Sequence, residues 1–121
     1  MRAGSLVGRV TILEFETRER DDHVHLALRG ELDLSTTEKV DAELRRVEQS
    51  YPPVVVLDLS ELTFLDSTGL RLIVTADQRA RQGDRRLAIV KGPATVQRVF
   101  SITKLEERLD MVDTAADATA G

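Results

Sequence analysis

The chain contains no cysteine, no long apolar run and no excess of basic residues over its 121 positions. Without cysteine it can form no disulfide, thiolate metal site or cysteine nucleophile, and this composition fits a reducing compartment. No apolar run reaches membrane-spanning length, and the opening residues, MRAGSLVGR, lack the apolar core of a signal peptide. We therefore expect a cytoplasmic protein without a membrane partner.

Acidic residues outnumber basic ones, 21 to 17, which gives a formal net charge of -4. A nucleic-acid-binding surface usually needs a concentrated basic stripe. The densest basic stretch here, residues 79–86, is preceded by Asp77 and interrupted by Asp84. We interpret it as a solvated helix end followed by a turn, and we expect no nucleic-acid partner.

Signatures of catalysis are also missing. The chain has no GK[ST] phosphate-binding loop, and its DSTG stretch lacks the glycine that precedes the serine of a nucleophile elbow. Its two histidines, His23 and His25, share one face of a predicted strand, but there is no third histidine to complete a metal site. A solvent-facing pair is the simpler interpretation, so we expect no enzyme, no metal and no cofactor.

The residues that are present follow the pattern of one α/β domain. Hydrophobic residues make up 41% and charged residues 31%, as in an ordinary globular domain, and the length suffices to bury a core. Apolar spacings predict the order strand, strand, helix, strand, helix, strand, helix, strand. The predicted strands are 10–15, 23–30, 54–60, 85–90 and 108–112, and the predicted helices lie within 35–53, at about 68–81 and within 92–100.

Helices between strands imply a mixed, mostly parallel central sheet that is flanked by helices. The first two strands are separated by an Asp-Asp turn, so we expect a β-hairpin at the entry to the sheet. Ser35 followed by Glu38 predicts a capping box at the first helix. We expect a flexible N-terminal segment at 1–9 and, because the end of the chain is small and polar, a disordered tail at 114–121.

Two strand-end residues, Asp58 and Lys91, resemble the phosphorylated aspartate and the lysine of a response-regulator receiver domain. The resemblance fails at the first strand, after which a receiver has an acidic pair that holds Mg²⁺. Here Glu14 and Glu16 alternate along the strand, and a hairpin follows in place of a helix. The alternative for Asp58 is a local hydrogen bond near Ser60.

The stretch TFLDSTGLRLIV places Ser67 at the start of the second predicted helix. Serine, threonine and aspartate are preferred helix N-caps, and a cap contributes about 1 kcal/mol. The residues alone therefore favour a cap over a site of modification. A phosphate would nevertheless be acceptable there, because a helix start offers free N–H groups and partial positive charge.

Three segments carry a more specific signal: RGELDLSTTEKVDAEL, VVVLDLSELTFLDSTGLRLIV and KGPATVQRVFSITKLEERL. Together they resemble the bacterial anti-sigma factor antagonists, which are single-domain STAS proteins. The likeness runs from Val10 to about Val112, and the DSTGL block is its most specific part. It implies an α/β STAS fold for a domain at 10–113.

Members of that family bind an anti-sigma factor that is also a serine kinase, and this binding frees a sigma factor. The kinase phosphorylates a serine of the antagonist, which then dissociates, and a serine phosphatase resets it. The resemblance implies phosphorylation of Ser67, with Thr68 as a minor alternative where the usual motif has a second serine. STAS domains also act as unphosphorylated modules of sensory assemblies or lipid-transport complexes, which is the alternative function.

The implied binding surface joins the start of the second helix to the GELD turn, because both follow strands that end at the same edge of the sheet. Asp66 would place a negative charge beside the acceptor, and Gly69 would either give the kinase close backbone access or serve packing. The residues expected to bind the partner are Asp33, Ser35, Asp66, Thr68, Gly69 and Arg71. For Asp33 and Ser35 the alternative roles are those of a turn former and a helix cap.

Overall fold

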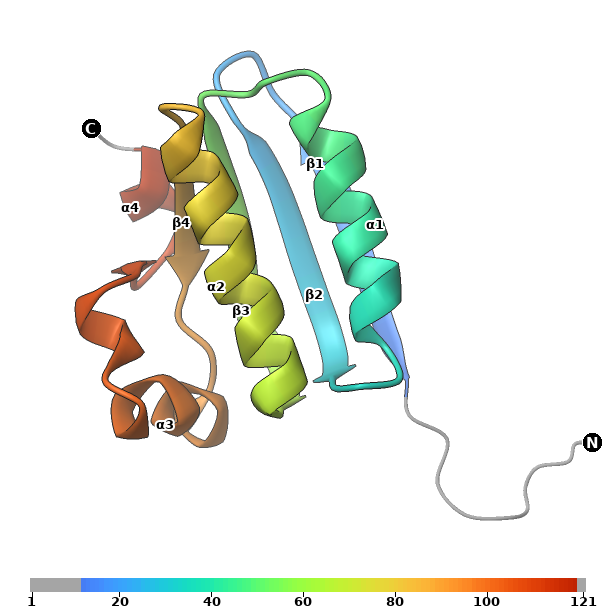
Figure 1. Ribbon diagram of the computed structural model, residues 1–121, viewed down its shortest axis with the longest axis vertical. Helices are drawn as coiled ribbons and strands as arrows, with labels where there is room; N and C mark the ends of the chain where they lie inside the picture. Colours follow the sequence, from blue (N-terminus) through green and yellow to red (C-terminus); the bar gives the residue numbers. More distant parts are fainter. Residues whose placement is uncertain (1–11, 120–121) are drawn as a thin grey trace, which may run out of the picture.

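The computed structural model describes residues 12–119 and shows a five-stranded sheet with the strand order β1-β2-β3-β4-β5 (Figure 1). The strands are β1 (Leu13–Glu19), β2 (Val24–Leu32), β3 (Val54–Leu65), β4 (Arg86–Val90) and β5 (Asp110–Val112). The helices are α1 (Thr37–Glu48), α2 (Ser67–Gln82), α3 (Ala94–Ile102), the short 3-10 helix η2 (Leu105–Glu107) and α4 (Ala115–Thr119). β1 is antiparallel to β2 and the other pairs are parallel, so the predicted mixed sheet is confirmed.

β1 and β2 form the predicted hairpin, and a backbone hydrogen bond from Arg20 to His23 closes its turn at 2.9 Å. Alternate residues of β2 are buried, as its pattern predicts: Val24, Leu26 and Leu28. β1 continues past the predicted strand 10–15, because charged side chains keep alternating outward along LEFETRE. The first two residues of that prediction lie outside the described part of the chain, as does the predicted flexible segment 1–9.

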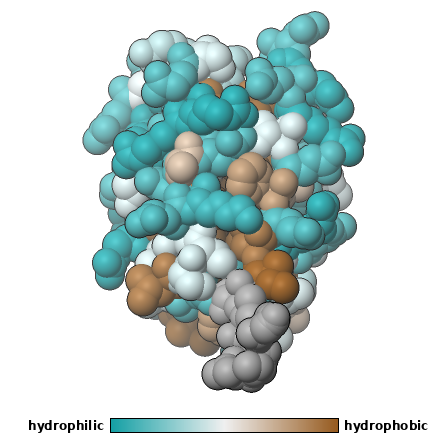
Figure 2. Space-filling view, turned by 90° about the vertical axis from the view of Figure 1, so that its right-hand side faces the viewer, coloured by the Kyte–Doolittle hydropathy of each residue, from teal (hydrophilic) through white to brown (hydrophobic). Residues whose placement is uncertain are grey.

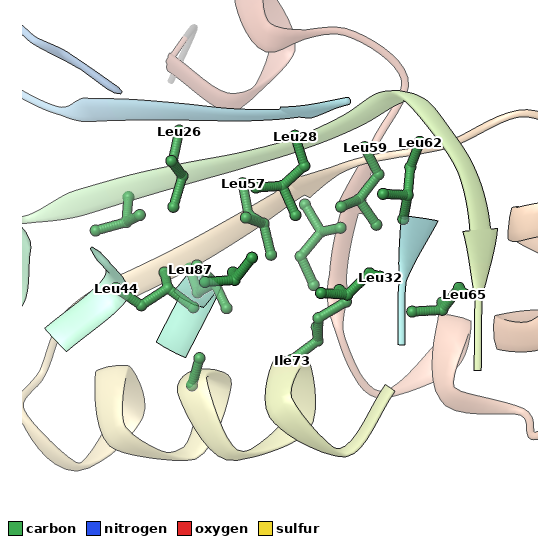
Figure 3. Packing of buried hydrophobic residues seen from close by; sticks show 14 of the residues in the cluster. Leu26, Leu28, Leu32, Leu44, Leu57, Leu59, Leu62, Leu65, Ile73 and Leu87 are labelled. Carbon is green, nitrogen blue, oxygen red and sulfur yellow. The ribbon is translucent and has the colours of Figure 1, made fainter. Parts of the chain in front are cut away.

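α1 and α2 lie side by side over one face of the sheet (Figure 1). Figure 3 shows leucines of β2 and β3 pointing toward Ile73 of α2, with Leu44 of α1 beside them. Burial of one such side chain contributes about 1.5–3 kcal/mol. This packing fixes the position of α2 along the sheet, and with it the position of the residues at the start of that helix.

An ion pair ties α2 to α1, and a second one lies within α2. The guanidinium of Arg79 donates to both carboxylate oxygens of Glu48 on α1, at 2.9 and 2.8 Å. Within α2, the largely buried Asp77 accepts a hydrogen bond from Arg81 at 2.8 Å.

Among residues 12–119, no helix combines the length and the apolar character needed to cross a membrane.

The other face of the sheet shows that the predicted disordered tail is wrong for residues 115–119. These residues form α4, whose Ala118 is 1% exposed and packs against Val56, Ala88 and Val90. Thr114 and Asp117 bond each other's backbone N–H groups at 3.2 Å, which closes the start of the helix. The small, alanine-rich composition of this segment predicts fraying, but the surface on β3 and β4 that buries Ala118 lies far away in the sequence.

Candidate functional site

The candidate site lies where β2 and β3 end, at the lower edge of the sheet in Figure 1. Leu32 pairs with Leu65 in the parallel register of these strands, so the segments that follow them emerge together. After β2 comes the loop 33–36, called here the β2–α1 loop, and after β3 comes the start of α2. The expectation that the GELD turn and the DSTG motif share one edge of the sheet agrees with this geometry.

Asp66 joins the two segments. It is the N-cap of α2, and its Oδ1 atom accepts a hydrogen bond from the N–H of Gly69 at 3.0 Å. Its Oδ2 atom accepts from the N–H of Leu34 in the β2–α1 loop at 3.3 Å, and its own N–H donates to the carbonyl of Leu32 at 3.2 Å. These three hydrogen bonds of Asp66 cap α2 and hold its start against the end of β2 and the β2–α1 loop.

Ser67 is the first residue of α2 rather than its cap, so the interpretation of Ser67 as an N-cap is wrong. The aspartate before it takes that role because a carboxylate accepts a backbone N–H strongly and suits the positive end of a helix. The side chain of Ser67 is exposed, and within residues 12–119 its hydroxyl makes no hydrogen bond. The helix start fixes the backbone of Ser67, and within the described residues the hydroxyl has no structural role of its own.

Gly69 is buried against the ends of both strands. A Cβ atom at this position would lie 2.8 Å from Leu32 Cγ and from Leu65 Cδ1, and 2.9 Å from the Leu32 carbonyl oxygen. Two roles are expected for Gly69: close backbone access for the kinase, or packing. These short distances support packing. The missing side chain lets the first turn of α2 approach the sheet.

The predicted capping box of Ser35 and Glu38 is wrong, because α1 begins one residue later with Thr36 as N-cap and no side-chain cap bond. Ser35 instead donates its N–H and its hydroxyl to Asp33 Oδ1, at 2.9 and 2.8 Å. The Thr36 hydroxyl donates to the Glu31 carbonyl at 2.8 Å. Asp33 thus orders the β2–α1 loop. The hydrogen bond from the Ser35 hydroxyl holds the pKa of the Asp33 carboxyl below its usual value.

Thr68 and Arg71 lie on a shallow groove between α1 and α2, beside Ser67. The groove has a volume of about 320 Å³ and is lined by Thr37, Glu38, Asp41, Arg45, Thr68, Arg71, Leu72 and Thr75. Thr68 is half-buried, whereas Arg71 and Ser67 are exposed. The more accessible of the two candidate hydroxyls is that of Ser67.

Two exposed apolar residues near the site were not singled out from the sequence. Leu34, in the β2–α1 loop, is 76% exposed, and Phe64, two residues before Asp66, is 47% exposed. Figure 2 shows a mostly hydrophilic surface on which hydrophobic side chains gather toward the lower end, the end at which this loop lies in Figure 1. Leu34 and Phe64 could have been found in the sequence, because each is an apolar residue close to turn or cap residues, where burial is not expected.

The remaining candidates lie away from this edge or do not meet. His25 bonds Asp58 at 2.9 Å, and Asp58 accepts the N–H of Ser60 at 2.9 Å, as the local alternative for Asp58 predicts. Lys91 pairs with Asp113 at 3.3 Å, so no receiver-like Asp–Lys arrangement forms. In the described part of the chain, no three His, Asp or Glu side chains are grouped to hold a metal ion.

Comparison with known proteins places this arrangement in a family. A family model described as the STAS domain matches residues 14–118. The chain belongs to the STAS domain family. The resemblance found in the sequence motifs is thereby confirmed.

Relatives of this STAS domain share most of its length. It is 32% identical to the anti-sigma-B factor antagonist of Listeria monocytogenes serovar 1/2a over 100 residues, which are 82% of this chain and 88% of that protein. It is 30% identical to the anti-sigma-B factor antagonist of Staphylococcus aureus (strain NCTC 8325) over 95 residues, 78% of this chain and 88% of that protein.

Solved structures agree with the STAS fold. An anti-sigma factor antagonist from Mycobacterium paratuberculosis superposes with a TM-score of 0.81 at 22% identity, over 90% of this chain and 92% of that one. SpoIIAA in its unphosphorylated form gives 0.73 at 22% identity, over 86% and 90% of the two chains. Bacillus SpoIIAA in its phosphorylated form gives 0.68 at 22% identity, over 86% and 94%. At these identities the likeness concerns the fold, and the predicted STAS fold is confirmed.

Proposed function

We propose that this STAS domain is an anti-sigma factor antagonist that binds an anti-sigma factor serine kinase and thereby frees a sigma factor. The names of its relatives in Listeria and Staphylococcus support this function. One exposed surface at this edge of the sheet combines the β2–α1 loop, the hydroxyl of Ser67 and the apolar side chain of Leu34, and such a surface suits a protein partner. The domain acts as a ligand and a substrate in this scheme, and the chemistry belongs to the kinase.

Phosphorylation of Ser67 switches the protein off. The observation that carries this proposal is the exposed Ser67 hydroxyl, which stands without a hydrogen bond at the first position of α2 while Asp66 fixes the helix start. In the transfer, Ser67 Oγ forms a bond to the γ-phosphorus of ATP, the hydroxyl loses its proton, and the bond to ADP breaks. A serine phosphatase restores the hydroxyl by hydrolysis.

The kinase binds the β2–α1 loop and the first turns of α2 together. Asp33 and Ser35 shape the loop through their mutual hydrogen bonds, and Thr68 and Arg71 lie on the adjoining groove. Asp66 and Gly69 contribute indirectly, since they set how closely helix and loop approach each other. No nucleic acid or membrane takes part in this interaction.

The phosphate blocks binding by charge and hydration. It adds about -1.5 to -2 charges at neutral pH. In the free protein it lies at a solvated helix start, where N–H groups stabilise an anion. In the complex it would be desolvated close to nucleotide phosphates of the kinase. SpoIIAA, which shares the fold, has been solved in a phosphorylated form, and that supports the same kind of switch here.

Incubation with candidate anti-sigma factor kinases and ATP, read by intact mass and peptide mapping, tests the acceptor. We expect one phosphate on the peptide that contains Ser67, and loss of most incorporation in Ser67→Ala. Thr68→Ala is the matched control and should still be labelled. Robust labelling of Ser67→Ala would contradict the assignment and move the acceptor to Thr68 or elsewhere.

A further inference from the structure

Arg71 lies one helical turn beyond Ser67 on α2, and both side chains are exposed. Residues four positions apart on a helix are neighbours, with their Cβ atoms about 5–6 Å apart. Within residues 12–119 the guanidinium of Arg71 makes no hydrogen bond and no ion pair. An uncommitted cation therefore stands beside the proposed acceptor hydroxyl.

None of the acidic groups around Arg71 forms an ion pair with it within residues 12–119. Asp66 uses both carboxylate oxygens on backbone N–H groups. Asp41, which lines the same groove, is paired with Arg45 at 3.0 Å. Glu38 also lines the groove, and its exposed carboxylate forms no ion pair within the described residues. Arg71 is thus free to meet a new anion.

We propose that Arg71 is the counterion of the phosphate on Ser67, whose oxygens accept hydrogen bonds from the guanidinium after modification. This inference rests on the proposed function, because it needs Ser67 to be the acceptor. An anion four residues N-terminal to a cation is the favoured orientation on a helix. A planar guanidinium also matches two phosphate oxygens at once. The first N–H groups of α2 stabilise the same phosphate.

The pairing changes what the partner meets. In the unmodified protein, Arg71 presents a free positive charge beside Ser67. After modification, the phosphate both adds negative charge and withdraws that cation from the surface. One modification therefore acts twice on the local charge, and Ser67→Asp reproduces it only in part because a carboxylate has less charge and fewer oxygens.

The test is a ³¹P NMR titration of the full chain with phosphoserine placed at position 67 during translation. Because the guanidinium favours the dianion, the second pKa of the phosphate should be about 0.5 units lower in the wild type than in Arg71→Gln. Arg71→Lys should give an intermediate value, since it keeps the charge but loses the planar fork. Circular dichroism confirms that each variant is folded.

Arg20→Gln is the matched control, because Arg20 is exposed in the hairpin turn at the opposite end of β2. It should leave the phosphate pKa unchanged. If Arg71→Gln titrates like the wild type, the pairing is overturned, and so it is if Arg20→Gln shifts the pKa equally. Since the phosphoserine is placed by translation, a missing kinase reaction counts against the proposed function alone.

Discussion

The carboxylate of Asp66 accepts a hydrogen bond from the backbone N–H of Leu34, 32 positions earlier in the chain, at 3.3 Å. Its other oxygen caps α2 through the N–H of Gly69. One side chain therefore sets both the start of the helix and the position of the β2–α1 loop beside Ser67. The geometry of the site depends on Asp66, whereas the hydroxyl of Ser67 makes no hydrogen bond within residues 12–119.

Replacing Asp66 should cost far more stability than replacing Ser67. Asp66→Ala removes the cap and the tie to the loop, and should lower the free energy of unfolding by about 1–2 kcal/mol. Ser67→Ala removes an unbonded hydroxyl and should change it by less than about 0.5 kcal/mol. Urea denaturation of both variants measures the difference. Equal losses would contradict the assignment of the cap to Asp66.

Gly69→Ala should destabilise the protein. The new methyl group would enter the space held by Leu32 and Leu65, at 2.8 Å from both side chains. Overpacking of this kind costs about 1–3 kcal/mol, although alanine is otherwise the better helix former. Thermal unfolding is the measurement, with Thr75→Ala, at an exposed position of the same helix, as control. A neutral or stabilising Gly69→Ala would show that the helix start can move away from the sheet.

The Asp58 carboxyl should contribute to the acid sensitivity of the fold. Burial raises its pKa, but hydrogen bonds from Ser60 and His25 outweigh burial and hold the pKa below the ordinary 3.8. For a lowered pKa, the stabilisation is present above the ordinary value and disappears as the pH falls through the folded-state value. Below about pH 4 the wild type should therefore lose stability more steeply than Asp58→Asn.

Melting temperatures recorded across acidic pH test this expectation. Asp21→Asn, in the exposed hairpin turn, is the control and should keep the steep loss of the wild type. Parallel profiles for the wild type and Asp58→Asn would contradict a contribution from Asp58.

The sheet and the helices α1 and α2 could be predicted because their signals are local. Alternation along β2 and the helical spacing of Val40, Leu44 and Val47 depend only on neighbouring residues, and each of these positions is buried. The position of the GELD turn and the DSTG motif at one edge of the sheet could be predicted as well, since parallel strands bring their following loops to one edge.

The cap assignments could not be decided from the sequence. Both Asp66 and Ser67 are good N-caps, and the choice depends on the N–H of Leu34, which only the fold brings near. At the start of α1, Ser35 donates its hydroxyl to Asp33 in the loop, so Glu38 has no capping partner. α4 could not be predicted for a similar reason, because the surface that buries Ala118 comes from β3 and β4.

The central claim is that a phosphate on Ser67 blocks partner binding and spares the fold. Calorimetric titration of the ADP-bound anti-sigma factor kinase with unmodified and phosphorylated protein tests it most directly, with circular dichroism of both forms alongside. We predict that phosphorylation weakens binding by at least about a hundredfold, which corresponds to about 2.8 kcal/mol, and that the two spectra coincide. Equal affinity of the two forms, or unfolding around α2 on phosphorylation, would contradict the account.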